Sequence, residues 1–177
     1  MIIMLEGPDL AGKTTLAKMI RRRIKNSVIV HRGPPTGTWD DEYLKPLQEM
    51  YETGGAYILD RWHWGETIYG PILRGRSIVD DDALEVIETW CTEHGVTRVL
   101  LMPSYELLRK RWEQQGDELV TSLTQLMQIA GEYQRLPYDT RFTVNFIGKQ
   151  PADDRVVAWL IAEAALKAEA HGWYKRV

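Results

Sequence analysis

Short apolar runs rich in β-branched residues alternate along this chain with segments of helical spacing. The runs cover residues 2–5, 28–31, 56–59, 96–102 and 142–147, and turn signals or helical patterns separate them. Strands that are apolar throughout are typical of parallel sheets, because helices cover both faces of such a sheet. The alternation therefore predicts an α/β fold of three layers, with a five-stranded parallel sheet flanked by helices.

Three later segments carry the start and stop signals of helices. The segment from about 80 to 94 has acidic residues in its first turn and Gly95 at its end. A second helix is expected from about 104 to 115, and the last from about Pro151, with Asp153 and Asp154 at its start. No repeat, low-complexity tract or linker interrupts the series of 177 residues, which predicts a single domain over 1–177.

The most informative motif directly follows the first predicted strand. Residues 7–15 read GPDLAGKTT and match the phosphate-binding pattern G-x-x-x-x-G-K-[ST]. Glycines let the backbone N–H groups wrap a polyphosphate, and the helix N-terminus adds partial positive charge. Lys13 can then reach the outer phosphates, and the Thr14 hydroxyl can bind Mg²⁺. The motif predicts binding of a nucleoside triphosphate. The predicted phosphate-binding residues are Gly7, Ala11, Gly12, Lys13, Thr14 and Thr15.

A pair of opposite charges ends the third predicted strand. Asp60 and Arg61 follow the apolar run at the edge where open α/β sheets bind their ligands. Asp60 is suited to holding Mg²⁺ through water, and Arg61 to pairing with a phosphate. The alternative is structural, with Asp60 capping the next turn and Arg61 neutralising it. The phosphate-binding motif favours the functional interpretation.

Composition narrows the range of partners and locations. A net charge of −3 argues against a broad basic surface for duplex nucleic acid and suits a small anionic substrate. Cys91 is the only cysteine, so no internal disulfide can form, which is typical of a cytoplasmic protein. The apolar start has no basic segment and runs into Glu6, so neither a signal peptide nor a membrane span is expected.

These motifs resemble those of the thymidylate kinases, a family of P-loop nucleoside monophosphate kinases. The family's phosphate loop typically reads E-G-x-D-G-x-G-K-[ST]-T, and residues 6–15 read EGPDLAGKTT, with Leu10 where the family usually has glycine. Asp60-Arg61-Trp62 is similar to the family's D-R-Y motif, and Arg32 with the turn after it is similar to an arginine and turn after its second strand. Residues 99–111 and 131–147 resemble its later strands and helices. The small size and altered acceptor loop favour a phage member.

The resemblance implies transfer of the γ-phosphoryl group of ATP, with Mg²⁺, to the 5′-phosphate of a deoxynucleoside monophosphate. In this interpretation Asp9 faces the acceptor sugar, and Asp60 supports the metal or its waters. Such transfer needs mainly positioning and charge neutralisation. The residues implied as catalytic are Lys13, Asp9, Asp60, Arg61, Arg109 and Arg111.

The resemblance also implies a lid at about 109–120 that closes over the transferred phosphate. Arg109 and Arg111 are its candidate cations. They lie two apart on a predicted helix, so at most one of them can aim directly at the phosphates. The alternative for either residue is an ordinary surface arginine.

The acceptor site departs from the family pattern. Tyr69 fits the family's tyrosine, but Gly70 replaces its glutamine, and Trp62 and Trp64 are suited either to stacking on a base or to core packing. Arg74 is either a further phosphate contact or surface charge. The implied acceptor-binding residues are Asp9, Arg32, Arg61, Trp62, Tyr69, Arg74 and Tyr133.

Other functions stay open on the sequence alone. One keeps the ATP site but phosphorylates a deoxynucleoside or a hydroxymethyl pyrimidine in DNA, which requires Asp60 or Glu6 to act as a base. The acidic net charge disfavours a DNA substrate relative to a small nucleotide. Another is a nucleotide-dependent switch, but the N-K-x-D motif that reads guanine in such proteins is absent. Family members often pair, which makes a homodimer an open expectation.

Overall fold

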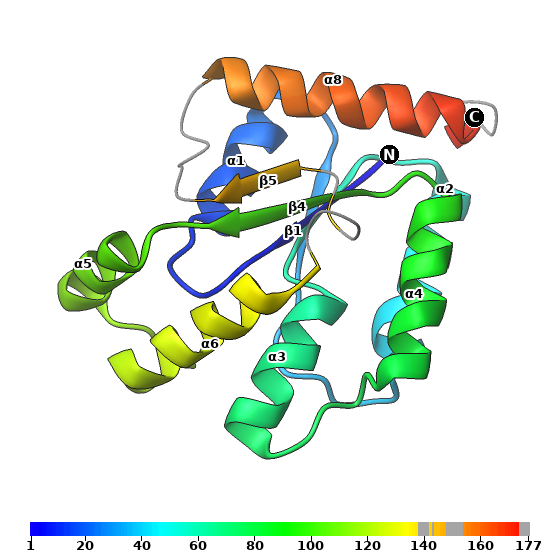
Figure 1. Cartoon of the computed structure of the whole chain (residues 1–177). Helices are drawn as coiled ribbons and strands as arrows, with labels where there is room; N and C mark the ends of the chain where they lie inside the picture. The colour runs from blue at the N-terminus through cyan, green and yellow to red at the C-terminus, as the bar shows by residue number, and fades with distance from the viewer. Residues whose placement is uncertain (138–141, 143, 148–153, 174–177) are drawn as a thin grey trace.

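Five parallel strands form one sheet in the computed structural model, which describes residues 1–137, 142, 144–147 and 154–173 (Figure 1). The order across the sheet is β2-β3-β1-β4-β5, and every neighbouring pair is parallel. The strands are β1 (Ile2–Glu6), β2 (Val28–His31), β3 (Tyr57–Asp60), β4 (Thr97–Met102) and β5 (Val144–Ile147). The predicted α/β fold with a parallel sheet is confirmed. Residue 143 of the predicted strand 142–147 lies outside the described residues.

Helices cover both faces of this sheet, with α1 and α8 on one side and α3, α4 and α6 on the other (Figure 1). The helices are α1 (Lys13–Arg23), the π-helix η1 (Asp40–Leu44), α2 (Lys45–Thr53), α3 (His63–Arg74), α4 (Asp81–Glu93), α5 (Tyr105–Gln115), α6 (Leu123–Arg135) and α8 (Asp154–Ala170). The helices expected near 80–94 and 104–115 are confirmed. Side chains of Asp80 and Ser104 cap them by accepting backbone N–H bonds. The expected start of the last helix at Pro151 lies outside the described residues.

The strand register brings polar residues to one edge of the sheet. Asp60 at the end of β3 stands beside Leu5 of β1 on one side and His31 of β2 on the other. All of β1 is buried, including Glu6 at its end. Because β1 is the central strand, the loop that leaves it lies next to the ends of β3 and β4.

A second apolar core fixes α3, the helix that carries Tyr69 and Arg74 of the predicted acceptor site. Trp64 belongs to this core, is 3% exposed, and has its ring 5.7 Å from that of Phe142. Its indole N–H donates to Glu88 on α4 (3.1 Å), which also pairs with His63 (2.8 Å) and Arg98 (2.7 Å). Trp64 is therefore a core-packing residue and is not available to stack on the base of an acceptor.

Candidate active site

The loop between β1 and α1 has the backbone conformation of a phosphate-binding loop. Gly7 has φ +140°, and a Cβ there would lie 2.1 Å from the carbonyl oxygen of Leu101, so no other residue fits without displacing β4. Gly12 has φ +97° and precedes the first turn of α1. Leu10, which stands where glycine is usual in the resembling family, has φ +62°. The loop thus keeps the left-handed conformation there despite the larger residue.

Lys13 is a buried cation inside this loop. Its Nζ donates to the carbonyl oxygens of Gly7 (2.8 Å) and Pro8 (2.7 Å). Burial lowers the pKa of Lys13, and the negative charges of Asp60 and Glu6 act in the opposite direction. An anionic ligand in the loop, such as the polyphosphate predicted to bind there, would further stabilise the positive charge of Lys13.

A hydroxyl and a carboxylate meet beside the loop. Thr14 Oγ1 donates to Asp60 Oδ2 over 2.6 Å, and His31 Nδ1 lies 3.5 Å from the same carboxylate oxygen. Asp60 Oδ1 is buried and has no hydrogen-bond partner among the described residues. These oxygen donors fit Mg²⁺. No group of three or more His, Cys, Asp or Glu able to hold a metal occurs in the described ranges.

Arg61 connects the loop to the neighbouring pocket. It follows β3 with φ +71°, and its guanidinium pairs with the buried carboxylate of Asp9 while lying 5.4 Å from the ring centroid of Tyr69. The backbone N–H of Asp9 donates to the Tyr69 hydroxyl (2.8 Å). The loop, the end of β3 and α3 are therefore held together around one arginine.

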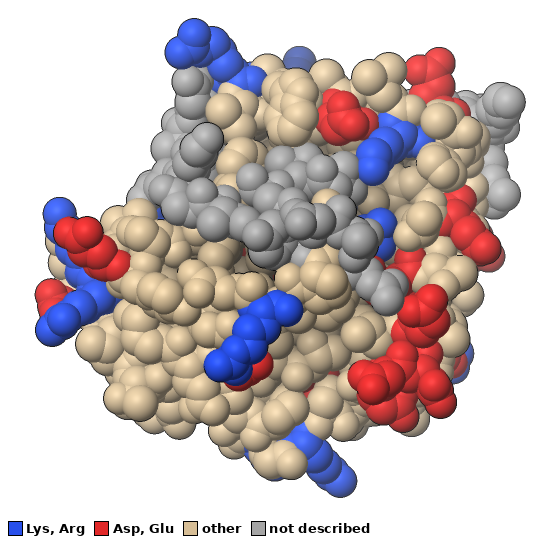
Figure 2. Space-filling model, in the orientation of Figure 1, with Lys and Arg blue, Asp and Glu red and all other residues tan. Residues whose placement is uncertain are grey.

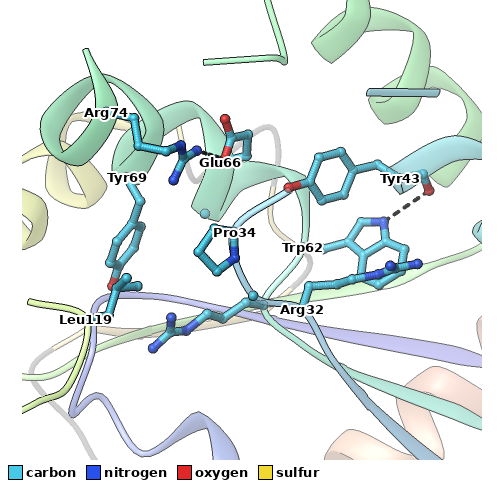
Figure 3. A pocket seen from close by; sticks show the side chains of 11 residues that line it. Arg32, Pro34, Tyr43, Trp62, Glu66, Tyr69, Arg74 and Leu119 are labelled. Carbon is cyan, nitrogen blue, oxygen red and sulfur yellow. Dashed lines mark hydrogen bonds and ion pairs between the residues drawn. The ribbon is translucent and has the colours of Figure 1, made fainter. Parts of the chain in front are cut away.

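Two pockets adjoin at this arginine. The first, beside the phosphate loop, encloses about 570 Å³ including its open side, and the second about 340 Å³. The first pocket is lined by Asp9, Lys13, Thr14, Asp60, Arg61, Gln115 and Asp117, among others. The second, which we call the acceptor pocket, is lined by Arg32, Pro34, Tyr43, Arg61, Trp62, Glu66, Tyr69, Arg74 and Leu119, among others (Figure 3). Arg61 is the only residue that both sets contain.

One end of the acceptor pocket is built from the segment that follows β2 and from η1. The Arg32 guanidinium lies 5.0 Å from the ring centroid of Trp62, which is 1% exposed, and 3.4 Å from the carboxylate of Glu42. Glu42 also accepts the backbone N–H groups of Thr36 and Gly37, each over 2.9 Å. The Thr36 N–H in particular lowers the pKa of Glu42. Glu42, which sequence reasoning missed, thereby holds both the arginine and the turn after β2.

The other end of the pocket carries an ion pair within α3. Glu66 in the first turn pairs with Arg74 in the last, and Glu66 Oε1 accepts the backbone N–H of Ile78 (3.1 Å). Figure 3 shows this pair on one side of Pro34, with Trp62 and Arg32 on the other. Neither of the two expectations for Arg74 anticipated this buried carboxylate partner.

The two candidate lid arginines diverge, as their spacing predicts. Arg111 donates to the carbonyl oxygen of Leu10 in the phosphate loop. Arg109 is exposed and pairs with Glu113 on its own helix (3.1 Å). The structure therefore brings Arg111 to the loop and leaves Arg109 outside it. Gln115 and Asp117, which lie within the predicted lid of about 109–120 but were not named as site residues, also line the loop pocket.

Tyr133 lies behind the acceptor pocket rather than in its lining. It is fully buried, its hydroxyl donates to Glu6 Oε2 (3.3 Å), and its ring centroid is 6.4 Å from that of Tyr69. Glu6 also accepts the backbone N–H of Trp62 (2.9 Å), and burial raises the pKa of this carboxyl. The expected direct contact of Tyr133 with an acceptor is thus corrected: the residue supports Glu6 and Tyr69.

Gly70 has no room for the glutamine of the resembling family. A Cβ there would lie 2.7 Å from the carbonyl oxygen of Arg76 and 2.7 Å from Glu66 Oε1. We expect Gly70→Ala to lower the free energy of unfolding by about 1–3 kcal/mol, because overpacking outweighs the gain in helix propensity. Urea unfolding measures the difference. As a control, Gly131→Ala in α6, whose nearest neighbour would be 3.8 Å away, should gain about 0.5–1 kcal/mol. A Gly70→Ala protein as stable as the parent would refute this packing argument.

The face shown in Figure 2 carries dispersed Lys and Arg side chains, whereas acidic side chains gather over the start of α4. This part of α4 contains Asp81 and Asp82 in its first turn, with Asp80 as its cap. Binding of polymeric nucleic acid requires several cations on one face, so the acidic surface at the start of α4 is unsuited to it. Within the described ranges, no helix is both long and apolar enough to span a bilayer.

Among solved structures, those of three proteins resemble this chain over nearly its whole length. A YorR protein from Bacillus subtilis, solved with phosphorylated GDP, aligns with a TM-score of 0.70 at 20% identity, covering 97% of this chain and 98% of that one. A Candida albicans thymidylate kinase aligns with a TM-score of 0.56 at 17% identity (94% and 92% covered). A deoxyadenosine kinase from M. mycoides, with the products dCMP and dCDP, aligns with a TM-score of 0.54 at 15% identity (94% and 99%).

The chain has the P-loop kinase fold. No model of a protein family matches it, and no curated protein matches it either. The identities are low, so these similarities establish the P-loop kinase fold alone and leave activity and substrate to be argued from the site.

Proposed function

We propose that this protein transfers the γ-phosphoryl group of ATP to the 5′-phosphate of a nucleoside monophosphate. The observation that carries the proposal is Arg61, which lines both the phosphate-loop pocket and the acceptor pocket. A cation at that junction is placed to bind the group that moves between two phosphates. The kinase names of two similar structures support the same reaction class.

The proposed mechanism depends on positioning and charge neutralisation. Lys13 and the loop N–H groups bind the triphosphate of ATP, and Arg32 and Arg61 hold the acceptor phosphate. Mg²⁺, held by Thr14 and supported by Asp60, would neutralise charge on the phosphates of ATP. We assign Arg111, which already contacts the loop, as the cation of a lid at about 109–120.

The site favours a monophosphate acceptor over a neutral hydroxyl group. A hydroxyl must lose a proton to a base, whereas an ionised phosphate needs none. One candidate base, Glu6, is buried and accepts from Trp62 and Tyr133. The other, Asp60, accepts from Thr14 through Oδ2 and is assigned in this proposal to support Mg²⁺. Arg32 and Arg61 of the acceptor pocket instead match the charge of a phosphate.

The proposal is tested by measuring ADP formation from ATP and Mg²⁺ with a panel of acceptors. The panel holds the common ribo- and deoxynucleoside monophosphates, the matching nucleosides, and an oligonucleotide containing hydroxymethyl pyrimidine. We expect at least one monophosphate to raise the rate about 10²-fold or more over basal hydrolysis, a typical range for placing a reactant. Stimulation by nucleosides or by the oligonucleotide alone would favour the alternative acceptors. Basal hydrolysis with every acceptor would refute a kinase.

A further inference from the structure

The acceptor pocket contains a charged pair that phosphate binding does not explain. The Glu66 side chain is 3% exposed and that of its partner Arg74 is 33% exposed, and both line the pocket. Arg61 also lines the phosphate-loop pocket, whereas Glu66 and Arg74 line the acceptor pocket alone. The phosphate of an acceptor therefore belongs at the end where Arg32 and Arg61 lie, next to the ATP site. The end with Glu66 is left for the base.

Both members of the pair keep unused hydrogen-bonding capacity. Each carboxylate oxygen of Glu66 can accept about two hydrogen bonds, and the contacts described use one on each, from Ile78 N–H and from Arg74. Arg74 has five N–H donors and uses one of its terminal nitrogens for Glu66. The pair therefore offers a ligand a set of donors next to a set of acceptors.

This pattern matches the edge of guanine. Guanine presents two adjacent acceptors, N7 and O6, followed by two adjacent donors, N1–H and the 2-amino group. Thymine would place O2, an acceptor, against the carboxylate, and adenine and cytosine would place an unprotonated ring nitrogen there. Gly70 contributes indirectly, since a Cβ at that position would lie 2.7 Å from Glu66 Oε1 and displace the carboxylate.

We infer that Glu66 and Arg74 select guanine, so that the acceptor is a guanine nucleoside monophosphate. In this arrangement Arg74 donates to O6 and N7, and Glu66 accepts from N1–H and the 2-amino group. The inference rests on the proposed function, because it assigns the base of the same acceptor.

The first test uses the unmodified protein and needs no variant. ADP formation is measured with dGMP, dIMP, dTMP, dAMP and dCMP at fixed ATP. Because dIMP differs from dGMP only by lacking the 2-amino group, we expect its kcat/KM to be about 10- to 100-fold lower, as for loss of a hydrogen bond to a buried charge. We expect dTMP to be at least about 10²-fold below dGMP.

The second test changes the carboxylate. Glu66→Gln should raise the KM for dGMP about 30-fold or more while leaving the KM for ATP within about threefold, and should bring the dGMP and dIMP rates close together. Glu132→Gln is the matched control, because this carboxylate of α6 also pairs with an arginine, Arg135, but lies outside both site pockets. Thermal unfolding checks that the variants fold. If Glu66→Gln does not fold, Arg74→Gln replaces it, and we expect the same loss of dGMP preference.

The outcomes separate the two proposals. Preference for dTMP, equal rates with dGMP and dIMP, or an unchanged preference in a folded Glu66→Gln protein overturns the assignment of guanine but leaves the kinase standing. If no monophosphate raises ADP formation, the proposed function fails and this inference fails with it.

Discussion

Replacement of Lys13 by Met is expected to reduce phosphoryl transfer by about 10³-fold, mainly in kcat, because a cation aimed at the transferring phosphates is lost. The measurement is the rate of ADP formation at saturating ATP and acceptor. The side chain is 5% exposed, lines the phosphate-loop pocket and donates to the carbonyl oxygens of Gly7 and Pro8, and we expect neither solvent nor a neighbouring lysine to replace its charge there.

The same substitution should leave the fold intact. Burial lowers the pKa of Lys13 below that of the unfolded chain, so the unfolded state binds the proton more tightly between these two values. Burial of the protonated lysine therefore costs stability below its lowered pKa, and this cost declines as the pH rises from there towards 10.5, the ordinary value. Removing it offsets the two lost hydrogen bonds, and the unfolding temperature should stay close to that of the parent.

Lys18→Met is the control for this experiment. Lys18 lies on the same helix but is exposed to solvent. We expect its replacement to change the rate of ADP formation by no more than about twofold. The free energy of unfolding should change by no more than about 0.5 kcal/mol, as for most surface substitutions. Transfer by Lys13→Met within tenfold of the parent would show that the loop does not bind the reacting phosphates.

The features predictable from the sequence were those set by local chemistry. The buried strands were predictable because an entirely apolar run such as residues 2–5 fits only a covered sheet. The phosphate loop was predictable because its backbone conformation demands glycine at fixed positions, and Gly7 and Gly12 have positive φ angles. The divergence of Arg109 and Arg111 followed from helix geometry alone.

Features that depend on distant segments were not predictable. Glu66 resembles any charged residue on a helix until the segment after α3 returns and places the Ile78 N–H on its carboxylate. Glu42 acquires its role only because η1 packs beside the turn that follows β2. Tyr133 was misplaced for the same reason, since its position depends on how α6 packs against α3 and β1.

The cations of the site share a common arrangement. Arg32 is held by Glu42, Arg61 by Asp9 and Arg74 by Glu66. Such pairs fix the direction of each guanidinium before a ligand arrives, which reduces the entropy lost on binding. When an arginine is truncated, the carboxylate that was its partner is left as an unpaired charge, which destabilises the fold. Activity and stability therefore change together.

Arg61 shows how the two effects can be separated. Arg61→Met alone leaves Asp9, whose side chain is 2% exposed, as an unpaired buried charge, and we expect a loss of about 3–5 kcal/mol in unfolding free energy. The double variant Arg61→Met with Asp9→Asn removes both charges and should recover most of that stability. Urea unfolding of the two variants and the parent measures this.

Activity should not recover in the double variant. We expect kcat/KM for the monophosphate acceptor to stay about 10²- to 10³-fold below the parent, since the junction of the two pockets has lost its cation. The KM for ATP should change by no more than about threefold, because Lys13 and the loop N–H groups remain. Arg135→Met, an exposed arginine of α6 whose side chain is 75% exposed, should alter neither constant. If the double variant lost ATP binding and acceptor binding equally, Arg61 would belong to the ATP site, and the division of the site into donor and acceptor pockets would be wrong.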